Sequence, residues 1–497
     1  MVKFLPRDAV ALALCIGIRL RSAAYARREL RELREHKRAA HSLIFFSGIE
    51  SQASVWGNRT LAGVKQLSIK GRWALMVQER WMRIIPVAIV MYTIAFINRT
   101  NISLALPSIS RDFHMNPTQA GSVAGIFFWG YLLLQIPGGY LAEHWSAKRF
   151  VTILLVVWGA CAIGCGLVHT WRELWVMRLL LGLAEGGVYP ATLIFLSHWF
   201  PRKERARANA FWNLCLPFAV IISSPLSGWI LDRWNWRVML VAGGALPFLW
   251  VVVWLIFIDD HPSEAKWISK EEREFLETTL RQESIHAEPG KSKVSLRSVL
   301  RPQIFILMIV YFCFISGQMG FLFWLPTAMG QAKKMSNLVI GILFTIPFIW
   351  AAISMVLISQ HSDKKHERRG HVAFALGMGG VFLIVGVLLS QHSPGLGFIF
   401  VSLAAMASYA PLGPFWAIPT ETLPRNVAGA SMGLINGFGN LGGFFGPLVL
   451  GYLNRRTGNF TSGFELLGIA MLVGAAMCFL VNPARKETAL EAAPKLD

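Results

Sequence analysis

Twelve stretches of about 20 mostly apolar residues follow one another along the chain, and they limit its fold more than any other feature. As a helix, each stretch is long enough to cross a hydrocarbon core of about 30 Å. None has the two-residue alternation of a barrel strand, and a helix satisfies every backbone polar group in lipid. The sequence therefore predicts an all-α membrane protein with twelve transmembrane helices. The expected spans are 84–106, 119–141, 150–169, 174–198, 208–231, 237–258, 303–327, 337–360, 372–391, 396–419, 428–453 and 464–482.

The distribution of charge predicts the orientation of these helices. Only 15% of the 497 residues are charged, against about 25% in a soluble protein. The net charge of +20 would suit a nucleic-acid partner, but 19 Lys and Arg residues lie in five alternate loops and eight in the loops between. This asymmetry follows the positive-inside rule and argues against nucleic acid. We expect a multi-pass protein of the inner (plasma) membrane, with the lipid bilayer as partner and both termini cytoplasmic.

Two landmarks recur along the chain at nearly the same spacing. Glu143 and Asp363 each precede a pair of basic residues, and they are 220 residues apart. Pro-Arg pairs at 201–202 and 424–425 are 223 residues apart. The chain therefore reads as two pseudo-symmetric six-helix halves, an arrangement typical of transporters with a substrate site near the midplane. The halves are expected at 81–258 and 303–482.

Three further segments surround the halves. Residues 1–80 form a basic extension before the first span, and we expect it to be non-native or dispensable. Residues 259–302 are expected to be a cytoplasmic linker, in which Ser269 and Glu272 have the spacing of a capping box that opens an amphipathic helix. Residues 483–497 are expected to be a cytoplasmic tail. No cysteine has zinc or redox spacing, so no metal and no cofactor are expected.

Several motifs resemble those of a known family. The loop sequence "GGYLAEHWSAKRF" resembles the loop 2–3 signature of the major facilitator superfamily, with Glu143 for the usual Asp and Ser146 for the second Gly. Over roughly 80–483, the motifs together are similar to the anion:cation symporter family, whose members carry organic anions, typically with protons. The motifs are "INRTNIS", "FFWGYLLLQIPGGYL", "RLLLGLAEGGVYPA", "WFPRKERARA", "HPSEAKWIS" and "FWAIPTETLPRNVAGASMGLINGFGNLGGFFGP". The resemblance implies conformational gating by Glu143, Lys148, Arg149, Asp363, Arg368 and Arg369.

Three charged residues lie deep inside predicted spans: Arg99, Arg178 and Glu185. Such groups are costly in lipid and are functional by default. Arg178 and Glu185 are seven residues apart and therefore share a helix face, while Arg99 lies at an intermediate depth. The expected cluster has a charge of +1, which attracts an anion. Because the planar guanidinium matches a carboxylate, we expect Arg99 to bind the substrate, and Arg178 is expected to be a second substrate-binding residue. A structural Arg99 bonded to backbone carbonyls is the alternative.

Glu185 is the only deep acid and no His lies deep in a span, so Glu185 is the expected proton-coupling residue. The alternative is a permanent ion pair of Glu185 with Arg178. In family members with an acid beside the helix 1 Arg, that acid is a second candidate proton site. Here the position is Asn98, which favours one coupled proton over two.

Polar and aromatic residues of other spans complete the expected substrate site. Tyr131 matches a family position that faces the cavity, and Trp416 lies among prolines where helix 10 could be broken. The deep amides need hydrogen-bond partners, either a substrate or another helix, and the last two of them lie one turn apart on one face. They are Asn213, Gln318, Asn436 and Asn440.

The sequence thus predicts a secondary transporter that takes up a small organic anion with a proton and acts as a monomer. A hydroxylated sugar acid suits the amides, and an aromatic carboxylate suits the many aromatic residues. A drug or cation antiporter of the same fold would need an acid-dominated site, and the expected cluster with a charge of +1 argues against it. A membrane enzyme lacks support, because no nucleophile, metal or phosphate motif lies in the spans. A sensor would need an output domain.

Overall fold

The computed structural model describes residues 78–286, 301–332, 335–423 and 425–481, and these residues form helices and no strands. The expectations for the extension 1–80, apart from its last three residues, and for the tail 483–497 lie outside them. The first half contains α3 (Gln78–Thr100), α4 (Ile102–Asp112), α5 (Pro117–Gly125), α6 (Phe127–His144), α7 (Ala147–Leu167), α8 (Trp171–Gly186), α9 (Val188–Trp199), α10 (Arg202–Asn213), α11 (Cys215–Arg233) and α12 (Trp236–Phe257). The linker contains α13 (Lys270–His286). The second half contains α15 (Pro302–Ala332), α16 (Asn337–Lys365), α17 (Arg369–Ser390), α18 (Pro394–Tyr409), α19 (Leu412–Thr422), α20 (Arg425–Asn440), α21 (Gly442–Thr457) and α22 (Thr461–Cys478).

The helical elements confirm the all-α membrane fold, although several spans are broken. By length and apolar composition, ten helical stretches of the described residues can cross a membrane, or eleven if a pair bent by 43° within α5 and α6 is one span. The expected span 428–453 consists of α20 and α21, which have 16 residues each. By this measure the described residues contain ten or eleven spans, against the twelve expected. Hydropathy alone does not reveal the breaks, because both parts of a broken helix remain apolar.

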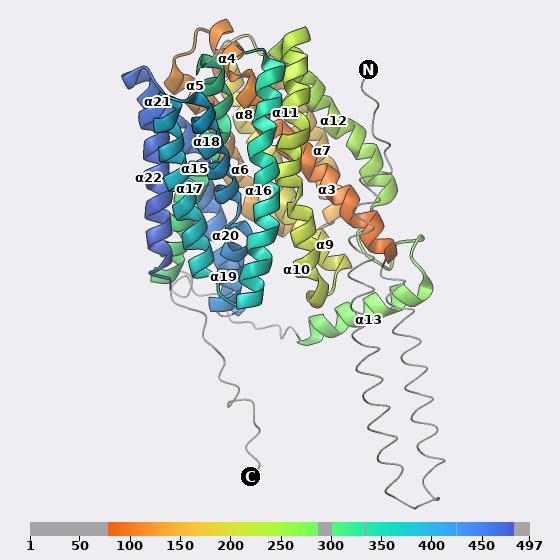
Figure 1. Ribbon diagram of the computed structural model, residues 1–497. Coiled ribbons are helices and arrows are strands. Elements are labelled where there is room, and N and C mark those ends of the chain that lie inside the picture. The colour runs from red at the N-terminus through yellow and green to blue at the C-terminus, as the bar shows by residue number, and fades with distance from the viewer. Residues whose placement is uncertain (1–77, 287–300, 333–334, 424, 482–497) are drawn as a thin grey trace, which may run out of the picture. The chain divides into compact units, whose positions relative to one another are not determined.

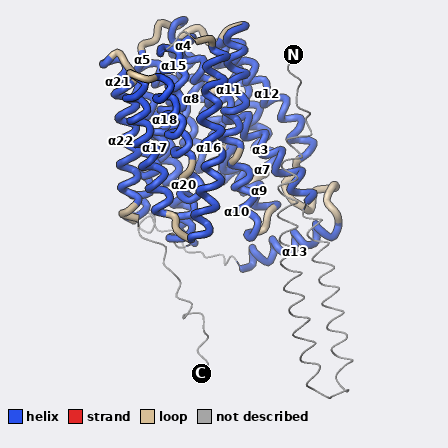
Figure 2. The backbone as a smooth tube through the Cα atoms, in the orientation of Figure 1, coloured by secondary structure: helices blue, strands red, loops and turns tan. Residues whose placement is uncertain are grey.

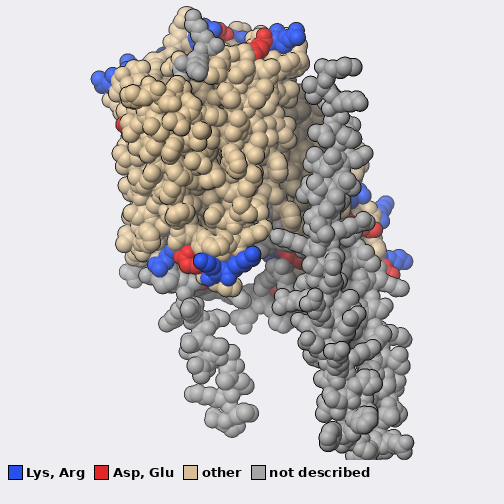
Figure 3. Space-filling view, viewed as in Figure 1, with Lys and Arg blue, Asp and Glu red and all other residues tan. Residues whose placement is uncertain are grey.

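The helices from α3 to α12 and from α15 to α22 run alongside one another in a bundle (Figures 1 and 2). On the face seen in Figure 3, the coloured charged side chains lie at the two ends, and the band between them lacks them. Such a band is what a bilayer requires of the lipid-facing surface. We call the end where α13 lies the linker end, and the end with the α4–α5 and α11–α12 loops the far end.

Close backbone contact joins the two halves near the far end. There α11 of the first half packs against α16 of the second, and α5 packs against α21. A Cβ atom at Gly228 would lie 2.3 Å from the carbonyl oxygen of Asn337, and one at Gly341 would lie 2.3 Å from that of Ser224. Glycine at these positions thus permits the backbones of α11 and α16 to touch.

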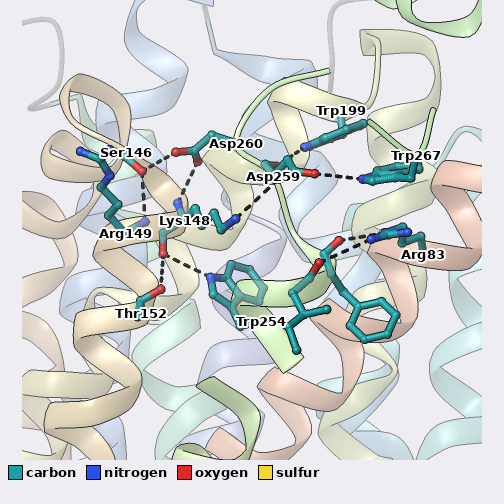
Figure 4. A network of polar contacts seen from close by, with 12 residues as sticks. Arg83, Ser146, Lys148, Arg149, Thr152, Trp199, Trp254, Asp259, Asp260 and Trp267 are labelled. Atoms are coloured by element: carbon teal, nitrogen blue, oxygen red, sulfur yellow. Dashed lines mark hydrogen bonds and ion pairs between the residues drawn. The ribbon is translucent and has the colours of Figure 1, made fainter. Parts of the chain in front are cut away.

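At the linker end, two acids that follow α12 tie the first half together (Figure 4). The carboxylate of Asp260 accepts hydrogen bonds from the Ser146 hydroxyl and from the backbone N–H of Lys148, at 2.8 Å, so it caps the start of α7. The carboxylate of Asp259 lies 3.5 Å from the Lys148 ammonium and accepts the indole N–H of Trp267 at 3.0 Å. The beginning of the linker is therefore fixed to the first half.

Helix α13 packs on a buried ion cluster formed by Arg80, Glu204 and Glu272. The buried Arg80 guanidinium lies 2.7 Å from the Glu204 carboxylate and 3.7 Å from that of Glu272. The hydroxyl of Ser269 accepts the backbone N–H of Glu272 at 3.2 Å, as the capping-box spacing predicts. The second bond of a capping box, from the backbone N–H of Ser269 to the Glu272 carboxylate, is not formed. That carboxylate turns toward Arg80 and accepts no hydrogen bond from the described residues.

The docking of α13 is expected to weaken as the pH rises. Burial raises the pKa of Glu272 to about 7, against the opposing effect of Arg80, whereas an exposed Glu has a pKa of about 4.3. A carboxyl whose pKa is raised by docking favours the docked state when protonated. The contribution is therefore complete below about pH 4.3 and is lost as the pH rises to about 7, at about 1.4 kcal/mol for each unit of pKa shift.

Amide hydrogen exchange of α13, corrected for the intrinsic rate, measures this effect. Protection of α13 should be lower at pH 8 than at pH 5, and Glu272→Gln should remove the difference. The matched control is Glu274→Gln, which changes an exposed acid of the same helix and should leave the pH profile unchanged. Equal pH profiles in the parent and in Glu272→Gln would contradict the assignment.

Candidate functional site

The candidate site surrounds a break in the first spanning helix. Helix α3 ends at Thr100 and α4 begins at Ile102, and Asn101 between them keeps helical backbone angles, so the break is a local interruption of the hydrogen-bond ladder within the span Glu79–Asp112. The residues "NRTN" at this point include Asn and Thr, whose side chains compete with helical hydrogen bonds. The hydroxyl of Thr100 donates to the carbonyl of Phe96 at 2.7 Å. The break lies in the interior, since Asn98, Arg99 and Asn101 are all buried.

Arg178 of α8 supports this break. Its buried guanidinium donates hydrogen bonds to the backbone carbonyls of Asn98 at 3.4 Å, Arg99 at 3.3 Å and Ala124 at 3.2 Å. Ala124 lies just before the junction of α5 and α6, so one side chain serves two irregular points. Its predicted contact with the substrate remains a prediction.

Arg99 and Glu185 form a buried ion pair beside the break. A guanidinium nitrogen of Arg99 lies 3.2 Å from a carboxylate oxygen of Glu185, and both side chains are almost fully buried. The Nε atom of Arg99 and the Oε1 atom of Glu185 have no hydrogen-bond partner among the described residues. The structure thus brings the three deep charges together, and Glu185 pairs with Arg99 rather than with Arg178.

Aromatic rings gather around the Arg99 guanidinium. Its Cζ atom lies 4.6 Å from the ring centre of Tyr131 and 4.9 Å from that of Phe127, with Phe96 at 5.5 Å and Tyr92 at 6.0 Å. The predicted residue Tyr131 therefore contacts the charge cluster. Sequence reasoning missed Tyr92, although it lies seven residues before Arg99 and so on the same helix face.

Of the predicted amides, Asn436 connects the halves, and Asn440 bonds to Asn436 within α20. The Asn436 amide of α20 donates to the Gln135 side chain of α6 at 2.8 Å. The Asn440 amide in turn donates to the side-chain oxygen of Asn436 at 2.9 Å, which agrees with the prediction that the two share a face. Asn436 thus makes a helix–helix hydrogen bond, while binding of the substrate by these two amides remains a prediction.

The remaining predicted residues differ in how their polar groups are occupied. Asn213 donates to the backbone carbonyl of Asn209 at 2.9 Å, within its own helix. Gln318 is buried, and its Nε2 atom has no hydrogen-bond partner among the described residues. The ring of Trp416 lies 5.1 Å from Tyr311, as part of an aromatic group between α15 and α19. Gln318 is therefore the predicted amide with free donors.

The predicted gating residues of loop 8–9 form an ion cluster at the linker end. The Arg368 guanidinium lies 2.6 Å from the carboxylate of Asp363 and 2.9 Å from that of Glu421, which sequence reasoning missed. Arg369 donates to the carbonyl of Val481 at 2.7 Å. All five residues belong to the second half.

The predicted gating residues of loop 2–3 are arranged differently. Lys148 pairs with Asp259, as described above, while Glu143 and Arg149 are exposed and form no ion pair with the side chains that the structure describes. None of the ion pairs seen at the two loops among the described residues joins one half to the other, so gating by these residues remains a prediction. No group of three His, Cys, Asp or Glu side chains in the described part of the chain could hold a metal ion.

Broken spanning helices with buried charges at the breaks are the architecture of a secondary transporter, not of an enzyme. The sequence profile of the Major Facilitator Superfamily matches residues 88–447, and the chain belongs to this family.

Relatives by sequence include transporters of sugar acids and of a drug. The chain is 31% identical over 438 residues to a putative tartrate transporter of Agrobacterium vitis, with 84% of this chain and 94% of the relative covered. It is 27% identical to the probable galactarate/D-glucarate transporter GarP of Escherichia coli K12, with 80% and 93% covered. It is 28% identical to a quinolone resistance transporter of Acinetobacter baumannii, with 80% and 93% covered.

Solved structures agree on the fold. A bacterial homologue of the human lysosomal transporter Spinster, in an inward-facing and occupied conformation, matches with a TM-score of 0.64 at 16% identity, covering 81% of this chain and 96% of that one. The xylose transporter XylE of E. coli, in a partially occluded inward-open conformation, also matches with a TM-score of 0.64, at 15% identity and with 82% and 98% covered.

Removal of Arg178 is expected to destabilise the protein. Arg178→Ala leaves three buried backbone carbonyls without their donor, at a cost on the order of 3 kcal/mol. The thermal midpoint of the purified protein should therefore fall. Arg172→Ala, which changes an exposed Arg of the same helix, is the matched control and should leave the midpoint unchanged. An unchanged midpoint for Arg178→Ala, together with lost substrate binding, would assign Arg178 to the substrate instead.

Proposed function

We propose that the protein is a proton-coupled symporter that takes up a small organic anion by alternating access. The observation that carries the proposal is the buried pair of Arg99 and Glu185. A guanidinium and a carboxylate at 3.2 Å form a site in which one anion already occupies the position that a substrate carboxylate needs. Substrate binding and the charge of Glu185 are therefore coupled.

The coupling is a competition for one guanidinium. While Glu185 is ionised, its carboxylate accepts a hydrogen bond from Arg99 and neutralises it. A proton on Glu185 removes that charge and leaves the planar guanidinium free to bind the substrate carboxylate bidentately. Release of the proton on the opposite side restores the carboxylate of Glu185, which pairs with Arg99 again and displaces the substrate. Arg178 holds the backbone at the break throughout.

The charge balance favours one proton for each monoanion. The second acid of some family members is here Asn98, whose buried amide cannot titrate. The three charges of the cluster sum to +1 with Glu185 ionised. Adding one proton and one monoanion leaves this sum unchanged, so the loaded and empty clusters carry the same charge. We therefore assign no cofactor other than the coupling proton.

The substrate we propose is a sugar acid or a related hydroxy carboxylate. The names of the tartrate and galactarate/D-glucarate relatives support this class, as does the free Nε2 donor of buried Gln318; because those acids are dianions, each would need a second proton to keep the charge of the cluster unchanged. An aromatic carboxylate is the second candidate, which the rings around Arg99 favour. The amide chain from Gln135 to Asn440 could bond substrate hydroxyls once the halves separate.

In this proposal the linker end faces the cytoplasm and both termini lie there. The loops at the linker end carry most of the loop Lys and Arg residues, as the positive-inside rule requires of cytoplasmic loops. The far end, where α11 and α16 touch, is then closed toward the outside. Each monomer contains a complete set of the proposed site residues.

Uptake by proteoliposomes tests the proposed function directly. Sugar acids, aromatic carboxylates and a quinolone are offered separately, with and without an inward pH gradient. At least one organic anion should accumulate only with the gradient. Arg99→Lys should lower that uptake by at least about tenfold, because an ammonium keeps the charge but loses the bidentate fork. Gradient-independent uptake, or uptake of the quinolone alone, would contradict the proposal.

Glu185→Gln separates binding from coupling. Gln resembles the protonated acid in shape, so the variant should still bind substrate and exchange labelled for unlabelled substrate across the membrane. It should fail to accumulate substrate against a gradient, and its substrate affinity should lose its pH dependence because the titrating group is gone. The matched control is Glu173→Gln, which makes the same change at an exposed acid of α8. Gln318→Glu cannot serve as a control, since it adds a charge. Normal accumulation by Glu185→Gln would show that the proton is carried elsewhere.

A further inference from the structure

Asp232, the second-last residue of α11, contacts the beginning of α16 in the other half. One carboxylate oxygen accepts hydrogen bonds from the backbone N–H and the side-chain amide of Asn337, both at 2.9 Å. The other oxygen accepts the backbone N–H of Leu338, also at 2.9 Å. A single side chain of the first half thus makes three hydrogen bonds to the second.

The contact is a helix cap formed between halves. The first N–H groups of any helix have no partner within the helix, and a carboxylate at that position is stabilised by the helix dipole. In α16 the hydroxyl of Ser336 accepts only the N–H of Val339, at 3.3 Å. The N–H groups of Asn337 and Leu338 depend on Asp232. The cap of α16 is therefore complete only while α11 lies against it.

The position of this contact gives it a role in opening. It lies at the far end, next to the backbone contacts of Gly228 and Gly341 that bring α11 and α16 together. The two helices are neighbours in Figure 1. Among the side chains that the structure describes, in contrast, no ion pair at the linker end joins the two halves: Lys148 pairs with Asp259 at the start of the linker, and Arg368 pairs with Asp363 inside the second half.

We propose that Asp232 is a gating residue, which holds the far end closed by capping α16 and so sets the balance between the two conformations of the carrier. Opening of the far end separates α11 from α16 and exposes two backbone N–H groups and a carboxylate to water. Removal of the carboxylate takes these hydrogen bonds away from the closed conformation and so lowers its stability relative to the open one. The inference rests on the proposed function only for its role in transport, since the balance of conformations exists without substrate.

The experiment measures that balance directly. Spin labels at Arg172 and His392, exposed residues at the far end of the two halves, report the distance between the halves without substrate. Asp232→Ala should raise the ratio of open to closed molecules by roughly fivefold, the effect of losing a typical N-cap. Asp232→Asn should have a smaller effect, because an amide keeps one acceptor.

The matched control is Asn235→Ala. Asn235 caps α12 by accepting the N–H of Val238 at 3.0 Å, so this variant removes a cap at the same end but within one half. It should leave the distance distribution unchanged. A second variant, Gly341→Ala, tests the same contact without changing charge, since its Cβ would meet the carbonyl oxygen of Ser224; it should also favour the open molecules.

Distances in Asp232→Ala that equal those of the parent would overturn the proposal, as would an equal shift in Asn235→Ala. Failure of the proposed function is seen separately, because the distances require neither a substrate nor a proton gradient. If Asp232→Ala opens more readily but the protein transports no organic anion, the gating role of Asp232 is supported and the transport proposal is refuted.

Discussion

The interior of the bundle depends on one constraint, the need to satisfy backbone carbonyls where a spanning helix is broken. A break in lipid leaves carbonyl groups without their helical partners, and water is not there to replace them. Arg178 supplies donors to three of these groups, at Asn98, Arg99 and Ala124. The break lets α3 end directly after Arg99, and the same helix that provides Arg178 also provides Glu185. The residue that supports the break and the residue proposed to carry the proton therefore lie at two positions on one face of α8.

The linker-end contacts give each half its own internal ties. At the first half, Asp259 and Asp260 join the end of α12 to α7 and to the partly buried indole of Trp267, and Arg80 joins α3, α10 and α13. In the second half, Arg368 joins the loop after α16 to α19. Because these ties do not cross between the described parts of the halves, movement of one half against the other does not break them.

The sequence predicts this structure where a single physical quantity decides the outcome. Hydropathy locates the spans, and depth within them predicts that Arg99, Arg178 and Glu185 meet. Hydropathy does not predict the breaks. Leu441 lies between α20 and α21, yet it is as apolar as a residue inside a continuous helix. Asp232 and Glu421 are not recognisable either, because an acid near a helix end resembles an ordinary surface charge. Only the pairing of distant helices reveals their partners.

In the proposed mechanism Glu185 takes up a proton, and the rings around Arg99 have a consequence for that step. An aromatic ring attracts a cation through its quadrupole and contributes no net charge, so four rings within about 6 Å stabilise the guanidinium without cancelling it. When Glu185 becomes neutral, Arg99 therefore keeps favourable neighbours in a site of low dielectric. Its positive field, no longer offset by a carboxylate, then extends over the interior and attracts the next anion that enters.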